Sequence, residues 1–378
     1  MNIGVNTRLL IDGKLEGIGW FTKQILENMV VKHREHKFYF FFDRKYSKKF
    51  VFSENVIPII IPVPARSPLL WHIYFDMLLP LYCKIYKIDV FFSPENYIPK
   101  NIKKTVICTV HDINFIHNPQ YIGNVSHRKY FLKYFGLNAR KSDKVITVSN
   151  FSKKDISENM NVPEEKIEVV YNAANDCYKP LPRENKEQTL QQIKQKYTKG
   201  RDYFYFVGSI SKRKNLQGLF KAFDVFKQRN ENDIQLVIIG NAKWWDEEIE
   251  KAYSEMKYKE DVILLGRLSS EETALITSAS IALVFVSLFE GFGIPIVEAF
   301  QTGTSVITSN LTSMPEIAED AAIVVNPYNT EEIANAMEKV LDKEIRQQLI
   351  EKGFERNKIF SWEKSSEKVW NIITKLAH

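Results

Sequence analysis

Cysteine is scarce in this sequence, and its scarcity limits what can hold the fold together. The 378 residues include three cysteines, Cys83, Cys108 and Cys177, and no two of them form a C-x-x-C pair. An odd number at these spacings argues against a disulfide framework and against a structural zinc site. We therefore expect a protein of the reducing cytoplasm, and no acidic motif for a metal ion stands out in the sequence.

The sequence also lacks a long uninterrupted apolar run. Its most apolar stretch, residues 69–86, is broken by His72, Asp76, Pro80 and Lys84, whereas a membrane-spanning helix needs about 20 predominantly apolar residues. We expect this stretch to form a helix at the core or at an interface. Residues 1–6 run straight into an apolar alternation without the basic segment of a secretory signal, so we expect no such signal.

The composition is that of a globular protein with an uneven charge. Hydrophobic residues make up 44% and charged residues 26% of the 378 positions, and such a length predicts two domains of about 100 to 200 residues each. Residues 1–178 hold 25 Lys and Arg against 17 Asp and Glu, whereas the remainder holds 27 against 29. The basic front half suits nucleic acid, an anionic membrane surface or a phosphorylated acceptor, unless its lysines are ordinary solvated ones.

Short β-rich runs alternate with helical patterns along the whole chain. Six strands are predicted in the front half, at residues 3–5, 38–42, 56–61, 90–92, 106–110 and 145–148. Six more follow, at residues 203–207, 234–239, 262–265, 281–286, 305–307 and 322–325. Helices are predicted to begin near Trp20, after Ser149 or Ser152, near Asn215 and near Pro295. The alternation predicts an α/β fold with parallel sheets.

A polar stretch, residues 179–200, separates the two series of strands and predicts a domain junction. We expect an N-terminal domain at residues 1–178 and a C-terminal domain at residues 179–362. Two such series suggest two Rossmann-like, doubly wound parallel sheets facing one another across a cleft. Ligands bind such sheets at the carboxyl ends of the strands, so functional residues are expected just after them.

The strongest local signal is the segment Glu290 to Glu298, EGFGIPIVE, between a predicted strand and a predicted helix. Gly291 and Gly293 let the backbone approach a ligand closely, and the free amides at the helix start attract phosphate. Glu290 and Glu298 would accept hydrogen bonds from the hydroxyls of a sugar and of a ribose. The alternative is that Glu298 stabilises its own helix and Glu290 is solvated.

A second signal follows the strand at 203–207, where VGSISKRKN ends at Asn215. Arg213 and Lys214 there would neutralise a leaving diphosphate. Cations near the start of a helix interact unfavourably with the helix dipole, so their presence there favours a functional role. The alternative is that they are ordinary surface lysines at a helix start.

Two weaker signals lie in the front half. His111 and Asp112 end the strand at 106–110, where His111 could hydrogen-bond a sugar or the acceptor and Asp112 could orient the loop or accept a proton. A satisfied core histidine is the alternative. Gly17 and Gly19, in a loop before the first predicted helix, offer another anion-binding start, although they do not match G-x-G-x-x-G.

These segments together resemble glycosyltransferase family 4, the retaining group with the GT-B architecture. Residues 290–299 resemble its E-x7-E motif, residues 207–215 its phosphate-binding loop, residues 17–20 its acceptor-side glycine loop, and residues 110–112 its central histidine motif. Two departures stand out: Ala174 and Glu319 occupy positions where the family commonly has glycine.

The resemblance implies specific roles for these residues. Glu298 would hold the donor ribose, Glu290 the transferred sugar, and Arg213 and Lys214 the diphosphate. The backbone at Gly208 and at Gly291, Phe292, Gly293 and Ile294 would also bind the donor, and Gly266, Arg267 and Leu268 would pack on its nucleobase. It also implies a last helix, residues 363–378, that crosses back to the first domain, and a reaction that needs no metal or other cofactor.

The predicted activity is transfer of a hexose, with a lean to mannose, from a nucleotide diphosphate sugar to a glycan or lipid-linked oligosaccharide in surface polysaccharide assembly. The alternatives are a GT-B epimerase or phosphorylase and a non-catalytic nucleotide-sugar binding subunit. No nucleic-acid binding module is recognisable, so nucleic acid is not an expected partner. A peripheral contact with an anionic membrane is a further hypothesis, made by Lys23, Lys32, Arg34 and Lys37 together with residues 71–86.

Overall fold

The computed structural model describes residues 1–230, 232–241 and 245–377. The chain divides into two compact units, unit 1 at Met1–Asn172 with Ser361–His378, and unit 2 at Ala173–Phe360. The division therefore lies between Asn172 and Ala173, six residues before the boundary after Tyr178 that the sequence predicted. Tyr178 is buried within unit 2 and its hydroxyl is hydrogen-bonded to Glu298, which explains why the residues just before 179 belong to that unit.

Unit 1 is built on a seven-stranded sheet in the order β3-β2-β1-β4-β5-β6-β7, with every pair parallel. The strands are β1 (Asn2–Asn6), β2 (Lys37–Phe42), β3 (Val56–Ile60), β4 (Val90–Ser93), β5 (Thr105–Thr109), β6 (Lys144–Thr147) and β7 (Ile167–Val169). The α-helices are α1 (Gly17–Lys32), α2 (Pro68–Trp71), α3 (Leu79–Ile85), α4 (Asn114–His117), α5 (Val125–Lys141), α6 (Asn150–Met160) and α15 (Trp362–Leu376). A π-helix, η2 (His72–Leu78), joins α2 to α3, and 3-10 turns lie at Lys48–Phe50, Pro119–Tyr121 and Glu164–Lys166.

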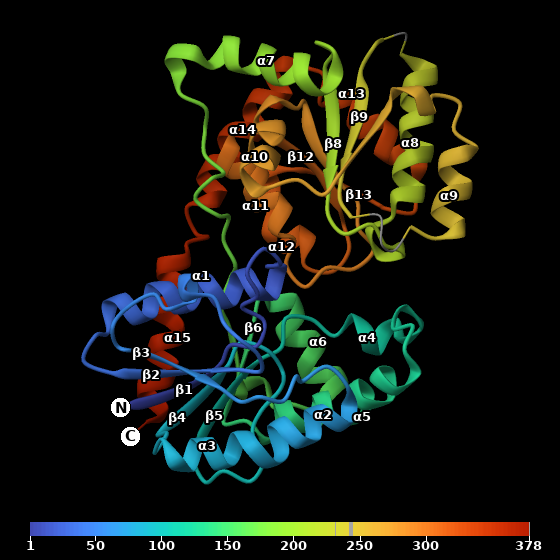
Figure 1. Cartoon of the computed structure of the whole chain (residues 1–378). Coiled ribbons are helices and arrows are strands. Elements are labelled where there is room, and N and C mark those ends of the chain that lie inside the picture. The colour runs from blue at the N-terminus through green and yellow to red at the C-terminus, as the bar shows by residue number, and fades with distance from the viewer. Residues whose placement is uncertain (231, 242–244, 378) are drawn as a thin grey trace. The chain divides into compact units, whose positions relative to one another are not determined.

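Different helices cover the two faces of this sheet (Figure 1). Helices α1 and α15 pack together on one face, where Ser366 Oγ donates to the carbonyl of Ile25 and the Trp370 ring lies against Phe38. The α2–η2–α3 segment, α5 and α6 pack on the other face, in a core that includes Phe41 and Phe91. Successive residues of a strand point to opposite faces, so Phe38 and Phe41 belong to different cores.

Unit 2 is built on a six-stranded parallel sheet in the order β10-β9-β8-β11-β12-β13. The strands are β8 (Tyr203–Val207), β9 (Gln235–Ile239), β10 (Val262–Gly266), β11 (Ala282–Phe285), β12 (Ser305–Ser309) and β13 (Ile323–Val325). The α-helices are α7 (Lys186–Thr198), α8 (Leu216–Arg229), α9 (Glu247–Ser254), α10 (Ser270–Ala279), α11 (Ile294–Thr302), α12 (Met314–Ala318), α13 (Thr330–Lys339) and α14 (Lys343–Asn357). Short 3-10 turns lie at Arg183–Asn185, Lys212–Lys214 (η6), Lys259–Asp261 and Glu319–Ala321.

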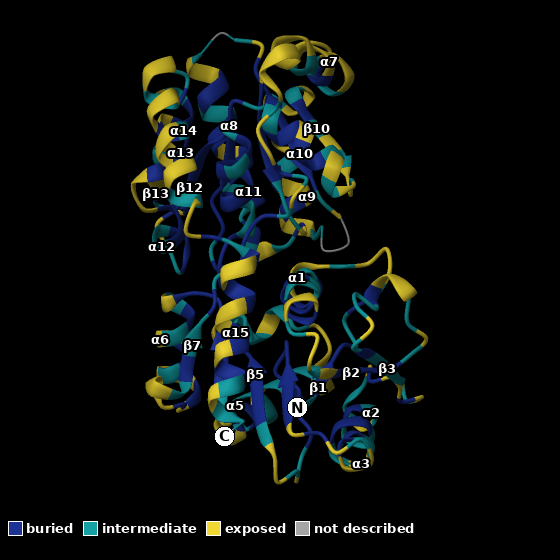
Figure 2. Cartoon of the chain, turned by 90° about the vertical axis from the view of Figure 1, so that its left-hand side faces the viewer, coloured by how far each residue is buried: buried dark blue, intermediate teal, exposed yellow. Residues whose placement is uncertain are grey.

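Two helical layers enclose this second sheet, with α8, α9 and α13 in one and α7, α10, α11 and α14 in the other (Figure 1). In both units the central strands are buried, and most of the exposed residues lie on helices, loops and the edge strands (Figure 2). The predicted α/β fold with two doubly wound parallel sheets is thus confirmed. In the part of the chain that the structure describes, no helix combines the length and apolarity needed to cross a bilayer.

Candidate functional site

The strand order reverses direction between β8 and β11 in unit 2, and the residues singled out in the sequence lie at that point. The loop after β8 carries Gly208 to Asn215, and the loop after β11 carries Glu290 to Gly293. At such a switch point, the crevice at the carboxyl ends of the strands is where doubly wound sheets bind ligands. The fold therefore brings the two strongest sequence signals to one place.

Glu290 is the centre of a buried charge cluster. Its Oε1 lies 2.7 Å from Arg213 Nη1 and 2.6 Å from Lys214 Nζ. Burial favours the neutral carboxyl, but the charges of Arg213 and Lys214 outweigh this effect and lower the pKa of Glu290 to about 2. Two cations thus share one carboxylate, and the cluster keeps a positive charge in excess.

The backbone around the cluster is fixed on both sides. Gly208 follows β8 with φ at 151°, and a Cβ there would lie 3.3 Å from Lys214 Cε, so the glycine leaves room for the lysine side chain. Asn215 caps α8 and donates through Nδ2 to the carbonyls of Val286 and Pro327. These contacts hold the loop after β8 against the loop after β11.

Helix α11 begins immediately after the cluster. Gly293 takes a left-handed conformation with φ at 100° as the residue before the helix, and Ile294 and Pro295 begin it. Ser313 Oγ donates to the carbonyls of Glu290 and Phe292, which fixes the loop that leads into the helix. Pro295 has no N–H and the amide of Ile296 donates to the carbonyl of Gly293, so the start of α11 attracts an anion mainly through the helix dipole, beside two cations.

Glu298 lies one turn further along α11 and is buried without a cation. Burial raises its pKa to about 8, although a hydrogen bond from Tyr178 acts in the opposite direction. A buried carboxyl of this kind accepts hydrogen bonds from ligand hydroxyls through its carbonyl oxygen when it is protonated and through both oxygens when it is ionised. Glu290 and Glu298, eight positions apart, therefore have pKa values shifted in opposite directions.

The residues predicted to contact a nucleobase lie at the end of β10. Gly266 has φ at 69° and its carbonyl accepts from the amide of Gly240, while Arg267 is exposed and Leu268 half-buried. Gly266 also lines a pocket of about 330 Å³ with Ile210, Ile238, Gly240, Trp245, Glu250, Tyr253 and Leu264. The aromatic and aliphatic lining suits a flat ring.

In unit 1, His111 follows β5 and lies at the carboxyl edge of the sheet. One ring nitrogen, Nε2, is 2.9 Å from the carbonyl oxygen of Pro94, and the ring packs edge-on against Phe21. Burial lowers the pKa of His111, so the imidazole is neutral and donates to Pro94. Asp112 accepts from the amide of Asn114, the first residue of α4, and this contact orients the loop.

Gly17 and Gly19 lie inside the first turn of α1, which corrects the expectation of a glycine loop with the helix starting near Trp20. The helix begins at Gly17, and the amide of Trp20 already bonds to the carbonyl of Glu16. A Cβ at Gly19 would lie 3.2 Å from the carbonyl oxygen of Leu9, so this glycine permits close packing of the helix on the loop after β1.

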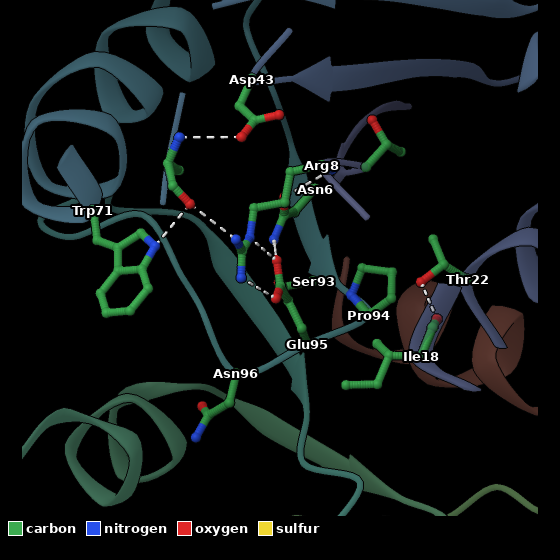
Figure 3. Close-up of polar contacts among 12 residues, drawn as sticks. Asn6, Arg8, Ile18, Thr22, Asp43, Trp71, Ser93, Pro94, Glu95 and Asn96 are labelled. Atoms are coloured by element: carbon green, nitrogen blue, oxygen red, sulfur yellow. Dashed lines mark hydrogen bonds and ion pairs between the residues drawn. The ribbon is translucent and has the colours of Figure 1, made fainter. Parts of the chain in front are cut away.

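Sequence reasoning missed a buried polar network at the same edge of unit 1 (Figure 3). Arg8 makes a bidentate pair with Glu95 at 2.5 and 2.6 Å, and Asn6 Nδ2 donates to Glu95 Oε1 at 2.7 Å. The remaining guanidinium nitrogen donates to the carbonyl of Ala65, whose amide bonds to Asp43. Asn6, Asp43 and Glu95 each follow a predicted strand closely, and that position was the available signal.

Two family descriptions match the chain and together span most of it. Residues 17–176 match "Glycosyltransferase Family 4", and residues 187–356 match "Glycosyl transferases group 1". Among named relatives, O-antigen chain mannosyltransferase B of Escherichia coli is 28% identical over 76% of this chain and 74% of its own length. O-antigen chain mannosyltransferase RfbU of Salmonella typhimurium is 26% identical over 78% of each chain.

Solved structures share the fold at lower identity. A sucrose-phosphate synthase of Thermosynechococcus elongatus superposes with a TM-score of 0.78 at 16% identity, covering 99% of this chain and 98% of its own. HepE of Anabaena, solved in complex with UDP and glucose, gives a TM-score of 0.74 at 16% identity and covers 99% of both chains. These likenesses place the two units in the GT-B fold class.

Proposed function

The chain belongs to glycosyltransferase family 4 and is a glycosyltransferase, and from that premise we propose that it transfers a mannose from a nucleotide diphosphate sugar with retention of configuration. The acceptor we propose is a glycan or lipid-linked glycan in surface polysaccharide or lipopolysaccharide assembly. The two O-antigen mannosyltransferases among its relatives support both the sugar and the pathway. The sugar donor is a UDP or GDP derivative.

The observation that carries the proposal is the cluster of Arg213, Lys214 and Glu290 beside the start of α11. Two cations and a helix start suit a diphosphate, and both cations contact the Glu290 carboxylate. When the donor binds, its phosphates take over these cations and the Glu290 carboxylate turns to a hydroxyl of the transferred sugar. Glu298 accepts hydrogen bonds from the ribose hydroxyls.

The proposed reaction breaks the bond between the anomeric carbon and the β-phosphate oxygen and forms a bond from that carbon to the acceptor oxygen. The acceptor proton passes to the leaving phosphate on the same face of the sugar. Arg213, Lys214 and the amides of α11 stabilise the negative charge on that phosphate, which is the role a divalent metal fills in other enzymes. The neutral His111 ring donates through Nε2 to Pro94, so its Nδ1 would accept a hydrogen bond from a hydroxyl of the sugar or acceptor.

A thermal-shift panel of UDP- and GDP-sugars tests the donor site. A donor at 100-fold over its dissociation constant stabilises the fold by about 2.7 kcal/mol. We expect one nucleotide class to stabilise the wild type and Glu351→Ala, a control on an exposed face of α14, but not Glu298→Ala. Equal stabilisation of Glu298→Ala would show that the ribose is held elsewhere.

Turnover separates an enzyme from a binding subunit. We expect radiolabelled sugar to pass from the stabilising donor to a lipid-linked glycan, with a loss of about 10²- to 10³-fold in kcat for Arg213→Ala. The rate should survive EDTA. Donor binding without transfer or hydrolysis would favour the non-catalytic alternative, and loss of activity in EDTA would contradict the metal-free mechanism.

A further inference from the structure

A row of exposed apolar side chains runs along the α2–η2–α3 segment of unit 1. Leu69, Met77, Leu81 and Ile85 are exposed by 70, 66, 51 and 58% respectively. They recur at multiples of four residues, and the π-helix in the middle, with its wider i→i+5 turns, offsets the drift that four-residue steps have on an α-helix. Isolated exposed leucines are ordinary, but a row of four on one segment marks an interaction surface.

The row faces away from the sheet. Tyr74, Phe75 and Leu79 on the same segment are buried against the sheet core, so the exposed row lies on the opposite side of the helix. Helix α5 packs beside this segment through Trp71 and Tyr130, whose ring centroids are 4.6 Å apart. Both helices cover the same face of the sheet, so their exposed sides both point outward (Figure 1).

The outward side of α5 adds apolar and basic side chains. Val125 and Leu132 are about half exposed, and Lys129 and Lys133 are exposed beside them. Across residues 68–85 and 125–141 the sequence has six basic residues, Lys84, Arg128, Lys129, Lys133, Arg140 and Lys141, against one acidic residue, Asp76. That carboxylate is already bonded to His72 and Lys100. We call the exposed apolar row and the exposed side chains of α5 together the α3–α5 surface; its residues are Leu69, Met77, Leu81, Ile85, Val125, Lys129, Leu132 and Lys133.

We propose that the α3–α5 surface docks unit 1 on an anionic lipid bilayer. The aliphatic row would enter the apolar boundary of the bilayer, and the lysines of α5 would lie at the level of the negative head groups, with their stems along the apolar surface. Two copies of the chain would not pair through this same surface, because two basic faces repel. The proposal goes beyond the transfer reaction and does not depend on which sugar is moved.

The structure also changes which lysines belong to such a surface. Lys23 and Lys32 lie on α1, which packs with α15 on the other face of the sheet, and Lys23 is paired with Glu27. Trp71 is buried among Tyr97 and Tyr130 and so does not anchor in lipid. The hypothesis that combined the α1 lysines with residues 71–86 therefore joined residues from opposite faces.

Flotation of the full chain with lipid vesicles tests the proposal. We expect the wild type to float with vesicles containing phosphatidylglycerol and not with pure phosphatidylcholine. The variant Met77→Ser/Leu81→Ser should reduce binding at least about tenfold, and Lys129→Gln/Lys133→Gln about fivefold for each lysine. The matched controls, Tyr328→Ser in unit 2 and Lys32→Gln/Lys37→Gln, should bind as the wild type does.

The altered side chains are exposed, so each variant should have the melting temperature of the wild type. Circular dichroism checks this. Wild-type protein that stays unbound to anionic vesicles would overturn the proposal, as would full binding by Met77→Ser/Leu81→Ser. If sedimentation instead showed a dimer or a protein complex that this variant abolishes, without vesicle binding, the surface would be a protein interface and the proposal would be wrong.

Discussion

At the residue scale, Glu290 and Glu298 show how one helix start gives two carboxyls opposite properties. Both are buried, but the charges of Arg213 and Lys214 hold Glu290 ionised, whereas burial alone raises the pKa of Glu298 to about 8. A carboxyl whose pKa is raised on folding costs no folding stability below its unfolded pKa near 4.5. It costs the full amount above its folded pKa. The effect of Glu298 on stability therefore depends on pH across that window.

We predict that unit 2 loses stability as pH rises from about 4.5 to about 8, by a few kcal/mol, because the unfolded carboxyl ionises in this range whereas folded Glu298 keeps its proton. Glu298→Gln should remove most of this decline and be more stable than the wild type at pH 9. Urea denaturation of both proteins at pH 5 and pH 9 measures it. Parallel pH profiles for the two proteins would contradict the prediction.

Glu290→Gln should destabilise the donor-free protein by about 3 kcal/mol, because Lys214 is 7% exposed and would be left buried without its carboxylate. Adding Lys214→Met to this variant should recover part of the loss, since the cation that then remains, Arg213, is 30% exposed and also donates to the carbonyl of Phe289. Urea unfolding of the two single variants and the double variant measures the coupling. A single-variant cost below about 1 kcal/mol would mean that water already solvates Lys214.

At the element scale, the residue after α12 has a backbone conformation that its side chain disfavours. Glu319 has φ at 44° and ψ at −127°, a region that residues with a Cβ rarely adopt. We predict that Glu319→Gly raises stability by about 1 kcal/mol, since glycine adopts this region without strain. The exposed ion pair of Glu319 with Arg356 contributes little against this gain.

Glu319→Ala is the control for that change, because it removes the same ion pair but keeps a Cβ. Its melting temperature should equal or fall below that of the wild type, while Glu319→Gly melts higher. If both variants shifted alike, backbone strain would not be the cause.

The elements that the sequence predicted well are the buried strands. All twelve predicted strands occur, with ends within a residue or two, because each is an apolar run enclosed by helices. The missed strand, β7, has three residues at a sheet edge with Glu168 in its middle, so its pattern is short and mixed. Helix α7 lies within the polar stretch at 179–200, and few of its side chains are buried, so its apolar periodicity is weak.

The residues of the candidate site likewise fall into those that the sequence predicted and those that it did not. Glu290, Arg213 and Lys214 were found because each lies next to a strand in a recognisable segment. Arg8 and Glu95 were not, because their pairing joins positions 87 apart and no local pattern records it. Residues that act through partners distant in the sequence need the fold before they can be identified.

At the scale of the whole molecule, unit 1 depends on a helix that follows unit 2 in the sequence. Trp370 on α15 is 7% exposed, stacks on His33 at 3.8 Å and packs near Phe38. We predict that Trp370→Ala costs unit 1 about 3 to 5 kcal/mol. Hydrogen exchange should show faster exchange in peptides of unit 1 and unchanged exchange in unit 2.

The exposed neighbour on the same helix provides the control. Lys368→Ala alters α15 without opening the core and should leave the exchange of both units as in the wild type. Equal loss of protection in unit 2 on Trp370→Ala would mean that the two units unfold as one cooperative body.

The position of α15 also bears on how the chain folds while it is being made. A ribosome adding about 5 to 20 residues per second delivers residues 173–360 between the sheet of unit 1 and its last helix, a delay of roughly 10 to 40 s. During that interval the face of unit 1 around Phe38 and Ile25, which α15 later covers, lacks its partner. The nascent chain thus presents an open apolar surface for a chaperone to hold, and unit 2 is complete before unit 1 can be.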